Sequence, residues 1–442
     1  MLNERLDLIG ILNVKSAAPA RFCTAHVLPP NPQGDMWSII NYSDLGRIDI
    51  DFEQLISDLE REIERNYMDI GGRRDSKGIV LVAYSTNGQY DAENSIKELE
   101  LLTKSANKVI LDKFIQTGRK IDPKYFIGKG KLREINLRAR HIGADTLVFN
   151  RELTPGQVRS INKETNLEIV DRTQIILEIF ASRATTSEGK LQVQLAQARY
   201  ALPRLVGKGI ELSQLGGGIG TRGPGEKKLE EQRRTLRKQI DTLEKKIDEL
   251  SRRRSHTRKQ RMSHRISTAT FIGYTNAGKS TLFNTLTKSN VLVENKLFST
   301  LNPTTRKLTL PSGKQILVTD TVGFISQLPK ELLNAFRATL EELGESSLLI
   351  HVADISDPLL DEKIESVEKI LLETGYELIP RITILNKADR VNKEIAYNIS
   401  KRYNAAVISA KHKETTAAFF KSLESKLTEL NGTENMINKK IA

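Results

Sequence analysis

The order of apolar and polar positions divides this chain into stretches of different character. From Lys77 onward, short apolar runs such as GIVLVAYS and DTLVFN alternate with stretches of helical period such as AENSIKELELLTKSAN. Short apolar runs are typical of buried strands, and the helical stretches between them are long enough to return the chain to the start of a parallel strand. The alternation predicts an α/β domain with a mainly parallel sheet over residues 77–182.

A different pattern follows and predicts a helical hairpin over residues 183–264. The first helix, GKLQVQLAQARYALPRLV, carries one apolar stripe: Leu191, Leu195, Ala198, Leu202 and Leu205. A second helix is predicted from about Glu226, with apolar positions spaced as in a coiled-coil seam: Leu229, Leu236, Ile240, Leu243, Ile247 and Leu250. Two helices joined by a loop should pack antiparallel. The predicted loop, 207–225, has eight glycines among 19 residues, which is too many for a buried element.

The alternation of strands and helices returns over residues 265–430, so we expect a multidomain α/β protein. Residues 431–442 are typical of a frayed tail. Residues 1–76 combine a proline-containing segment, PPNPQGD, with one amphipathic helix near residues 51–65, and their role is unknown.

Length, charge and cysteine content narrow the class of protein. A chain of 442 residues is long enough for about three domains, and its formal charge of +13 favours a polyanionic partner. The single cysteine, Cys23, excludes an internal disulfide framework and fits a reducing compartment. No apolar run approaches the length of a membrane span, and the first apolar patch, LIGILNV, makes a poor signal peptide. We therefore expect a soluble, cytoplasmic protein without stable membrane insertion.

The stretch GYTNAGKST, residues 273–281, has the spacing of a phosphate-binding loop. Gly273 is followed after four residues by Gly278, Lys279 and Ser280, which is the Walker A pattern. Glycines let backbone N–H groups turn toward phosphate oxygens, and a helix beginning at Lys279 would add its positive N-terminal end. We expect the Lys279 ammonium to bind the β- and γ-phosphates and the Ser280 hydroxyl to bind Mg²⁺.

Two later motifs, NKAD and SAK, each follow an apolar run and predict recognition of guanine. Asp389 is able to accept hydrogen bonds from N1–H and the exocyclic amine of guanine, whereas adenine offers no such pair. Asn386 is expected to buttress this loop and the stem of Lys387 to cover the base, while the Ala410 N–H would meet guanine O6. Doubly wound sheets bind ligands at the carboxyl ends of their strands, where these motifs fall, and the set resembles the P-loop GTPase superfamily.

The motif DTVGF and the segment LFSTLNPTTRKL predict the γ-phosphate end of the site. Asp320 is placed to hold Mg²⁺ through water, and the Gly323 N–H to meet the γ-phosphate. Similarity to the FTTLxP pattern of Obg-like GTPases favours Thr300 as the switch-loop threonine that completes Mg²⁺ coordination, and Thr304 stays open as the alternative. Phe324 stands where many Ras-like GTPases carry a glutamine, so slow hydrolysis by the isolated protein is expected.

These motifs together define a predicted GTP site. The residues expected to bind the nucleotide are Gly273, Tyr274, Thr275, Asn276, Ala277, Gly278, Lys279, Ser280, Thr281, Asp320, Gly323, Asn386, Lys387, Asp389, Ser409, Ala410 and Lys411. Ser280, Thr300 and Asp320 are expected to hold Mg²⁺. Lys279, Thr300 and Gly323 are expected to take part in catalysis.

The residues before the phosphate loop carry a more specific resemblance. The chain reads FIGKGKLREI (126–135), then LTPGQVRSI, then VDRTQIILEIFASRATTSEGKLQVQLAQARYALPRLVG (170–207) and GGGIGTRGPGEKKLEEQRR (216–234). This is similar to the HflX family of ribosome-associated GTPases in the TRAFAC class, over residues from about 78 to 425. The family's hydrophobic residue after DTVG is matched by Phe324.

The resemblance implies an N-terminal α/β nucleotide-binding-like domain with a long antiparallel helical hairpin, followed by a P-loop GTPase domain with a doubly wound sheet. It implies a GTP-dependent switch that binds the large ribosomal subunit and splits stalled or idle ribosomes, with GTP hydrolysis stimulated by the ribosome. The hairpin loop is expected to approach the peptidyl-transferase centre. We expect a monomer, and the resemblance leaves ATP open as a further ligand of the N-terminal domain.

The second arm of the hairpin carries much of the positive charge. Residues 227–261 contain 14 basic and six acidic side chains, a net +8 of the chain's +13. A basic rod suits rRNA phosphates, and a glycine-rich tip brings backbone close to RNA. The candidate rRNA contacts are Lys208, Arg222, Arg252, Arg253, Arg254, Arg258 and Lys259. The alternative for the basic end of this arm is a solvated helix end. The alternative for the glycine-rich tip is a merely flexible connection.

One alternative function stays open beside ribosome splitting. A ribosome assembly or hibernation factor would bind rRNA in a nucleotide-dependent way without separating subunits.

The motif GKGK (128–131) has two possible interpretations, a second phosphate site or a strand-to-helix turn. It lacks the full cradle spacing and the hydroxyl of a phosphate-binding loop. The six histidines show no metal-ligand spacing, so zinc is not expected.

Overall fold

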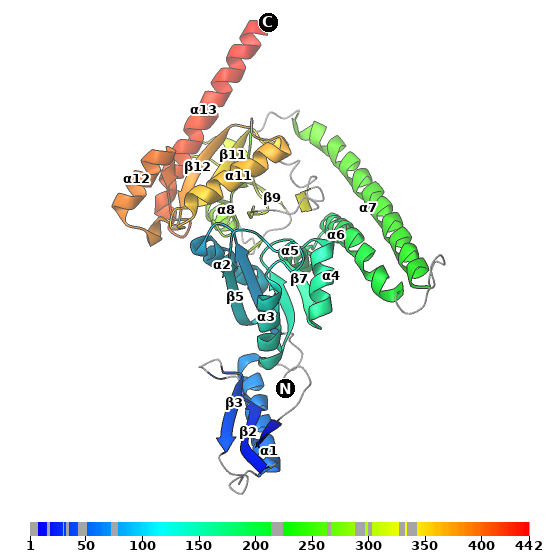
Figure 1. Ribbon diagram of the computed structural model, residues 1–442. Helices are drawn as coiled ribbons and strands as arrows, with labels where there is room; N and C mark the ends of the chain where they lie inside the picture. Colours follow the sequence, from blue (N-terminus) through cyan, green and yellow to red (C-terminus); the bar gives the residue numbers. More distant parts are fainter. Residues whose placement is uncertain are drawn as a thin grey trace. The chain divides into compact units, whose positions relative to one another are not determined.

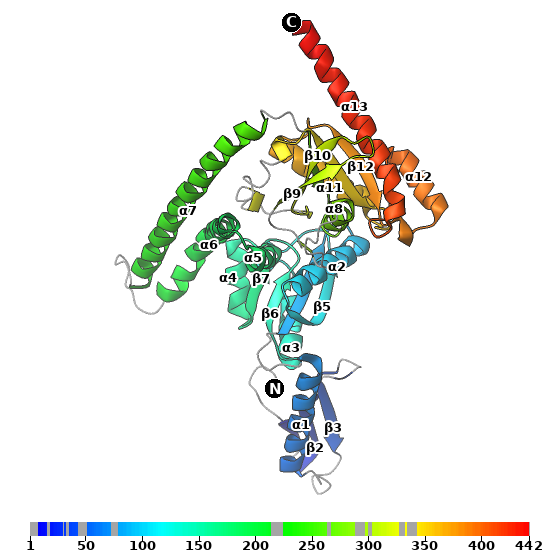
Figure 2. The same ribbon diagram turned by 180° about the vertical axis from the view of Figure 1, so that it is seen from behind.

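The computed structural model describes residues 8–15, 18–29, 31, 35–42, 51–71, 78–213, 224–262, 267–287, 297–298, 303–326, 332–333 and 343–441. The chain divides into two compact units, Met1–Ile176 and Leu177–Ala442, each with its own hydrophobic core. Figures 1 and 2 show the elements from opposite sides, coloured from blue at the N-terminus to red at the C-terminus.

The first unit begins with a three-stranded antiparallel sheet in the order β1 (Leu8–Lys15), β2 (Ala18–Val27) and β3 (Trp37–Tyr42). Helix α1 (Phe52–Gly71) follows, which confirms the amphipathic helix expected near residues 51–65. The sheet itself is not predicted from the sequence. Its strands flank a proline-containing segment, and their weak alternation of apolar and polar positions resembles that of a loop.

A four-stranded parallel sheet in the order β5-β4-β6-β7 forms the rest of the first unit. Its strands are β4 (Gly78–Ser85), β5 (Val109–Thr117), β6 (Ala144–Phe149) and β7 (Glu168–Asp171). The helices are α2 (Gln89–Ser105), α3 (Lys129–His141) and α4 (Pro155–Glu164), and α5 (Arg172–Arg183) follows β7. Every residue of β4 is buried, as expected of a central parallel strand covered on both faces. The predicted α/β class is confirmed.

Helices α6 (Ser187–Ser213) and α7 (Pro224–Met262) form the hairpin, and they are the two green helices that lie side by side in Figures 1 and 2. Leu195 and Ala198 of α6 are buried in one cluster with Ile240 and Leu243 of α7. The partly buried residues that extend this cluster are Leu191, Leu202, Leu236 and Ile247. The seam therefore consists of positions that the apolar spacing predicts, although Leu205, Leu229 and Leu250 do not belong to the cluster.

The expected extent of the connecting loop, 207–225, is wrong. Helix α6 continues through Ser213 and α7 begins at Pro224, so both ends of the expected loop are helical. Each glycine costs about 1 kcal/mol in a helix relative to alanine, but helices in proteins depend mostly on tertiary packing, which α6 obtains along the seam. Proline is well suited to the first position of a helix, which explains where α7 begins. Residues 214–223, with Arg222 among them, lie outside the described residues.

The remaining part of the second unit is a six-stranded sheet in the order β13-β12-β11-β8-β10-β9, parallel except for the pair β9 and β10. The strands are β8 (Thr268–Ile272), β9 (Thr304–Thr309), β10 (Gln315–Asp320), β11 (Leu348–Asp354), β12 (Arg381–Asn386) and β13 (Ala406–Val407). Helices α8 (Lys279–Thr287) and α13 (Thr416–Ile441) cover one face, and α11 (Leu360–Thr374) and α12 (Lys393–Tyr403) cover the other. Within the described part of the chain, no helix is long and apolar enough to cross a membrane.

Candidate functional site

The loop between β8 and α8 has the tight backbone path of a phosphate-binding loop. Gly273 has a φ of +144° and Gly278 a φ of +91°, both in the region that favours glycine. A Cβ atom at Gly273 would lie 2.2 Å from the carbonyl oxygen of Val352, and one at Gly278 would lie 2.2 Å from Nδ2 of Asn386. Both positions therefore require glycine, because the loop runs directly against the ends of β11 and β12.

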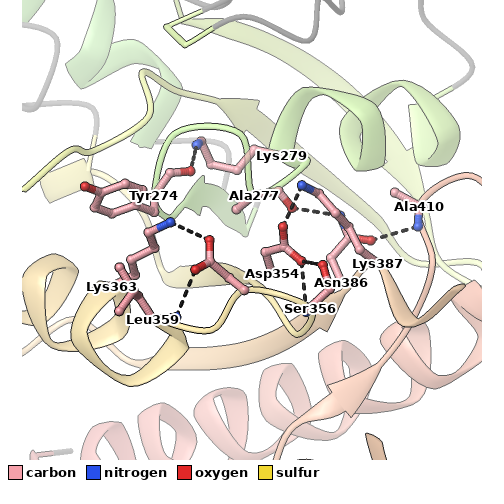
Figure 3. Close-up of polar contacts among 11 residues, drawn as sticks. Tyr274, Ala277, Lys279, Asp354, Ser356, Leu359, Lys363, Asn386, Lys387 and Ala410 are labelled. Carbon is pink, nitrogen blue, oxygen red and sulfur yellow. Dashed lines mark hydrogen bonds and ion pairs between the residues drawn. The ribbon is translucent and has the colours of Figure 1, made fainter. Parts of the chain in front are cut away.

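Lys279, the first residue of α8, is held inside this loop. Its side chain is only 5% exposed, and Nζ donates to the carbonyl oxygens of Gly273 at 3.0 Å and Tyr274 at 2.9 Å. Burial lowers the pKa of Lys279 to about 8, while the negative charge of Asp320 acts in the opposite direction. Figure 3 shows the ammonium beside the loop backbone. Phosphate oxygens at this position would offset the cost of burying the charge.

Ser280 and Asp320, two of the three predicted metal ligands, meet directly. Ser280 Oγ donates to Asp320 Oδ2 at 2.7 Å, and Asp320 is fully buried at the end of β10. Hydroxyl and carboxylate oxygens are the donors that Mg²⁺ prefers, so the residues present fit this ion. The third ligand, Thr300, lies outside the described residues. Its alternative, Thr304, is the first residue of β9 and stands opposite Asp320 in the antiparallel ladder.

The two base-recognition motifs are joined to the phosphate loop through Asn386. Asn386 Nδ2 donates to the Ala277 carbonyl at 2.8 Å, and its Oδ1 accepts from the Ala410 N–H at 2.8 Å (Figure 3). This matches the buttressing position expected of Asn386. The Ala410 N–H already has this partner, so contact with guanine O6 requires it to share or exchange that bond.

The side chain expected to contact guanine is oriented by a neighbour. Ser409 Oγ donates to Asp389 Oδ1 at 2.6 Å, and this hydrogen bond lowers the pKa of the exposed Asp389 carboxyl. The carboxylate is therefore ionised at neutral pH, as acceptance of two hydrogen bonds requires. Asp389 and Ser409 belong to the two separate motifs, and the fold brings them together.

Asp354 is a site residue that the sequence reasoning missed. Its Oδ2 lies 2.6 Å from Nζ of Lys387, and its Oδ1 accepts from the backbone N–H and hydroxyl of Ser356 (Figure 3). The pair fixes the lysine whose stem is expected to cover the base, and Lys387 itself has a left-handed φ of 63°. The sequence feature that could have indicated Asp354 is its place at the carboxyl end of the buried run LLIHVAD.

The side chain of Phe324 is packed into a hydrophobic cluster of the second unit. The side chain is 3% exposed, in a cluster with Ile272, Leu343 and Leu349 and with residues of α11. Its backbone pairs with the phosphate loop, because the Phe324 N–H donates to the Gly273 carbonyl at 3.0 Å. This position therefore supplies an apolar anchor and no polar group for an attacking water.

The remaining predicted nucleotide residues lie in the same loops. Tyr274, Thr275 and Asn276 are in the phosphate loop, Thr281 is on α8, Gly323 follows β10, and Lys411 is exposed after Ala410. Gly323 lies so near the loop that a Cβ atom on it would come within 2.9 Å of Lys279 Nζ. The roles of all these residues in binding and catalysis remain predictions.

Two other predicted groups of residues belong to α3, α6 and α7 and not to the loops of this site. In the motif GKGK, Lys129 lies 2.6 Å from Glu164 and Lys131 lies 2.6 Å from Glu134, and α3 begins at Lys129. The strand-to-helix turn is therefore the better interpretation of this motif. Among the candidate rRNA contacts, Lys208 is on α6, and Arg252 is exposed on α7. The others on α7 are Arg253, Arg254, Arg258 and Lys259.

Three protein-family descriptions match successive parts of the chain. "GTP-binding GTPase N-terminal" matches residues 93–181, and "GTP-binding GTPase Middle Region" matches residues 183–261. "50S ribosome-binding GTPase" matches residues 268–387, which contain the phosphate loop and Asp320.

Curated relatives match most of the chain. A protein named GTPase HflX from Lacrimispora saccharolytica is 46% identical over 347 residues, which cover 78% of this chain and 82% of that protein. GTPase HflX from Caldanaerobacter subterraneus is 45% identical over 354 residues, with 80% and 81% covered. A crystal structure of a GTP-binding protein from the archaeon Sulfolobus solfataricus in complex with GDP is 24% identical, with 81% and 99% covered and a TM-score of 0.41. A TM-score this low establishes no common arrangement of domains.

Proposed function

Because this chain belongs to the HflX family of GTPases, we propose that it is a GTP-dependent switch that binds the large ribosomal subunit and separates ribosomal subunits. The observation that carries the proposal is the combination of a guanine-nucleotide site and a basic helical hairpin in one unit of the chain. The site supplies a GTP-dependent change of state, and the hairpin supplies a surface for RNA phosphates.

The chemistry begins with the phosphate loop holding GTP. We expect backbone N–H groups near Gly278 and Lys279 to face the phosphates, the Lys279 ammonium to neutralise the charge of the β- and γ-phosphates, and the N-terminal end of α8 to add to this field. Asp389, oriented by Ser409, selects guanine. Mg²⁺ is a proposed cofactor that Ser280, Thr300 and, through water, Asp320 would hold, and it would neutralise charge that develops on the phosphate oxygens.

The attacking water needs a group that orients it, and Phe324 does not provide one. A phenylalanine ring forms no hydrogen bond of the kind that a glutamine side chain supplies, and this ring is anchored in the core. Hydrolysis by the isolated protein should therefore be slow. We propose that the large subunit stimulates it, either by supplying the missing group or by reorganising the residues that follow Gly323.

The hairpin is the part of the chain proposed to contact rRNA. The sequence of α7 has a basic segment at the end of the helix, with Arg252 to Arg254, Arg258 and Lys259, and we expect such a segment to contact phosphates in a salt-dependent way. The loop between α6 and α7 is proposed to reach toward the peptidyl-transferase centre. A ribosome assembly or hibernation factor would use the same surfaces, and only separation of intact ribosomes distinguishes the two functions.

The experiment that tests the proposal is GTP turnover by the purified protein, measured alone and with isolated large or small ribosomal subunits. We expect stimulation of roughly tenfold or more by large subunits and none by small subunits. Stimulation should weaken with rising salt, because phosphate contacts to α7 are screened. Equal turnover in all three samples would reject the ribosome as the partner.

A further inference from the structure

Two buried phenylalanine rings from distant parts of the sequence meet in the second unit. Phe180 is on α5, and Phe298 lies in the segment between α8 and β9. Their ring centroids are 4.7 Å apart at an interplanar angle of 47°, and their side chains are 1% and 2% exposed. Aromatic pairs at this separation contribute packing energy beyond the area that they bury, so the contact stabilises the position of Phe298.

The backbone at Phe298 has a conformation that tertiary contacts must maintain. Its φ is +57°, in the left-handed region that a bulky side chain rarely adopts. Such a conformation is unfavourable by itself and persists only where surrounding contacts over-determine it, and the burial of the ring against Phe180 is a contact of this kind. Strained residues are typical of ligand-binding and switch segments, and Phe298 belongs to LFSTLNPTTRKL, the segment expected to carry the switch-loop threonine.

Phe298 is close in sequence to the threonine that is expected to complete Mg²⁺ coordination. Thr300 follows Phe298 by two residues, and the alternative, Thr304, follows it by six. A connection of two residues spans at most about 7 Å, so an anchor at Phe298 limits how far such a threonine can range. At the other end of the segment, β9 begins with Thr304 opposite Asp320, the carboxylate that accepts from Ser280. The connection between Phe298 and β9 is therefore held at both ends, and one end is beside the expected Mg²⁺ ligands.

We propose that Phe180 is a positioning residue for the nucleotide site, which packs on Phe298, restricts the connection between Phe298 and β9, and thereby favours the binding of GTP with Mg²⁺. The proposal rests on the guanine-nucleotide site of the proposed function and does not depend on the ribosome. A segment that is fixed at both ends loses less conformational entropy when a ligand orders it than a segment fixed at one end. The threonine is expected to bind Mg²⁺ when the γ-phosphate is present, so the contact acts on GTP and not on GDP.

The test is the variant Phe180→Leu, which keeps an apolar side chain in the buried position and removes the contact between the rings. Dissociation constants for GDP and for a non-hydrolysable GTP analogue are measured by fluorescence titration with Mg²⁺ and without ribosomes. Ordering the backbone of one further residue changes an equilibrium by roughly tenfold. We therefore expect the affinity for the GTP analogue to fall by about tenfold relative to the affinity for GDP. In EDTA this ratio of affinities should be the same in the variant and the wild type, because the threonine acts through Mg²⁺.

A second variant, Phe298→Leu, removes the other ring and should lower the same ratio. If the two residues act through their mutual contact, the double variant should show no further fall beyond either single variant. Where Phe180→Leu loses the circular dichroism spectrum of the wild type, Phe298→Leu decides the question. The matched control is Phe149→Leu in the first unit, since Phe149 is also fully buried and its ring centroid is 5.5 Å from that of Phe126. It should leave the ratio unchanged.

An unchanged ratio in a folded variant would overturn the proposal. So would a higher ratio, because the contact would then hold the segment away from the nucleotide. Equal weakening of both nucleotides would also overturn it, because the rings would then support the unit as a whole. Failure of large subunits to stimulate turnover by the wild-type protein is a separate result. It would reject the ribosome as partner and leave the role of Phe180 to be judged by the ratio alone.

Discussion

At the scale of single residues, Asp389 is the side chain proposed to determine which base the site accepts. Its carboxylate is ionised and oriented by Ser409, so it offers acceptors and no donor. Guanine presents two donors on one edge, at N1 and at the exocyclic amine, and both match this carboxylate. An amide at the same position would present an N–H donor to one of them and lose that match.

The variant Asp389→Asn should therefore prefer xanthine nucleotides, which carry an oxygen in place of the exocyclic amine. Hydrogen bonds to a charged group contribute about 1.5–3 kcal/mol, so we expect the affinity for GDP to fall by roughly 10- to 100-fold. Competition between GDP and XDP measures the change. The matched control is Asp361→Asn on α11, where the carboxylate pairs with Arg402 at 2.8 Å outside the base-recognition loops. Retained guanine selectivity in Asp389→Asn would contradict the assignment.

Lys279 gives the binding reaction a predictable pH dependence. Burial holds the pKa of Lys279 at about 8 in the structure, and phosphate oxygens beside the ammonium would raise it. Below pH about 8 the lysine is charged before and after binding, so its protonation does not affect affinity. Above pH about 8 the free protein has lost this proton, binding must take it up, and affinity falls as pH rises.

At pH about 8 we expect GDP binding to take up roughly half a proton, because half of the Lys279 side chains are neutral before binding. Calorimetry in two buffers with different heats of ionisation measures this number directly. Uptake should approach zero when the pH is lowered by about two units, which serves as the internal control. No uptake at pH about 8 would show that Lys279 is fully charged before the nucleotide arrives.

Site residues that belong to a continuous sequence motif are predictable from the sequence. Site residues that only tertiary contacts bring together are not. Gly273, Gly278 and Lys279 are predictable because a Walker A loop is continuous in sequence. Asp354 belongs to no such motif, and only the packing of β11 beside β12 brings it to Lys387. The contact between Phe180 and Phe298 joins residues that the folded chain, and no sequence spacing, places together.

At the scale of elements, the periodicity of apolar positions predicts which residues pack in the hydrophobic core. The apolar repeat of α7 places Ile240 and Leu243 against Leu195 and Ala198 of α6, and the run GIVLVAYS became the fully buried strand β4. The three strands β1 to β3 were missed because strands with weak alternation of apolar and polar positions are not distinguished from loops by pattern alone. The ends of α6 and α7 were missed because glycine content predicts a loop, whereas both helices continue into this segment.

The hairpin tip should be separable from the nucleotide site. Replacing residues 216–225 with a short Gly–Ser linker leaves the seam residues of α6 and α7 in place, so helicity and GDP affinity should match those of the full chain. If the tip acts on the ribosome, stimulation of GTP turnover by large subunits should fall by roughly tenfold or more. Turnover and circular dichroism of the two proteins measure both effects. Full stimulation without the tip would show that this segment is only a connection.

At the scale of the whole molecule, charge is unevenly distributed along the chain. Residues 227–261 carry a net +8 of a total +13, and all of them lie on α7. The guanine-nucleotide site is assembled from loops in which Asp320 is buried and Lys279 is held by backbone carbonyls. One part of the molecule thus carries concentrated positive charge, and another has the geometry of a phosphate-binding loop.

The measurement that tests the central claim most directly is light scattering by intact ribosomes after addition of the protein with a non-hydrolysable GTP analogue. If the GTP-bound protein separates subunits, scattering falls in proportion to the protein added, and the same protein with GDP leaves it unchanged. Steady scattering from ribosomes that nevertheless bind the protein would contradict splitting and favour an assembly or hibernation factor.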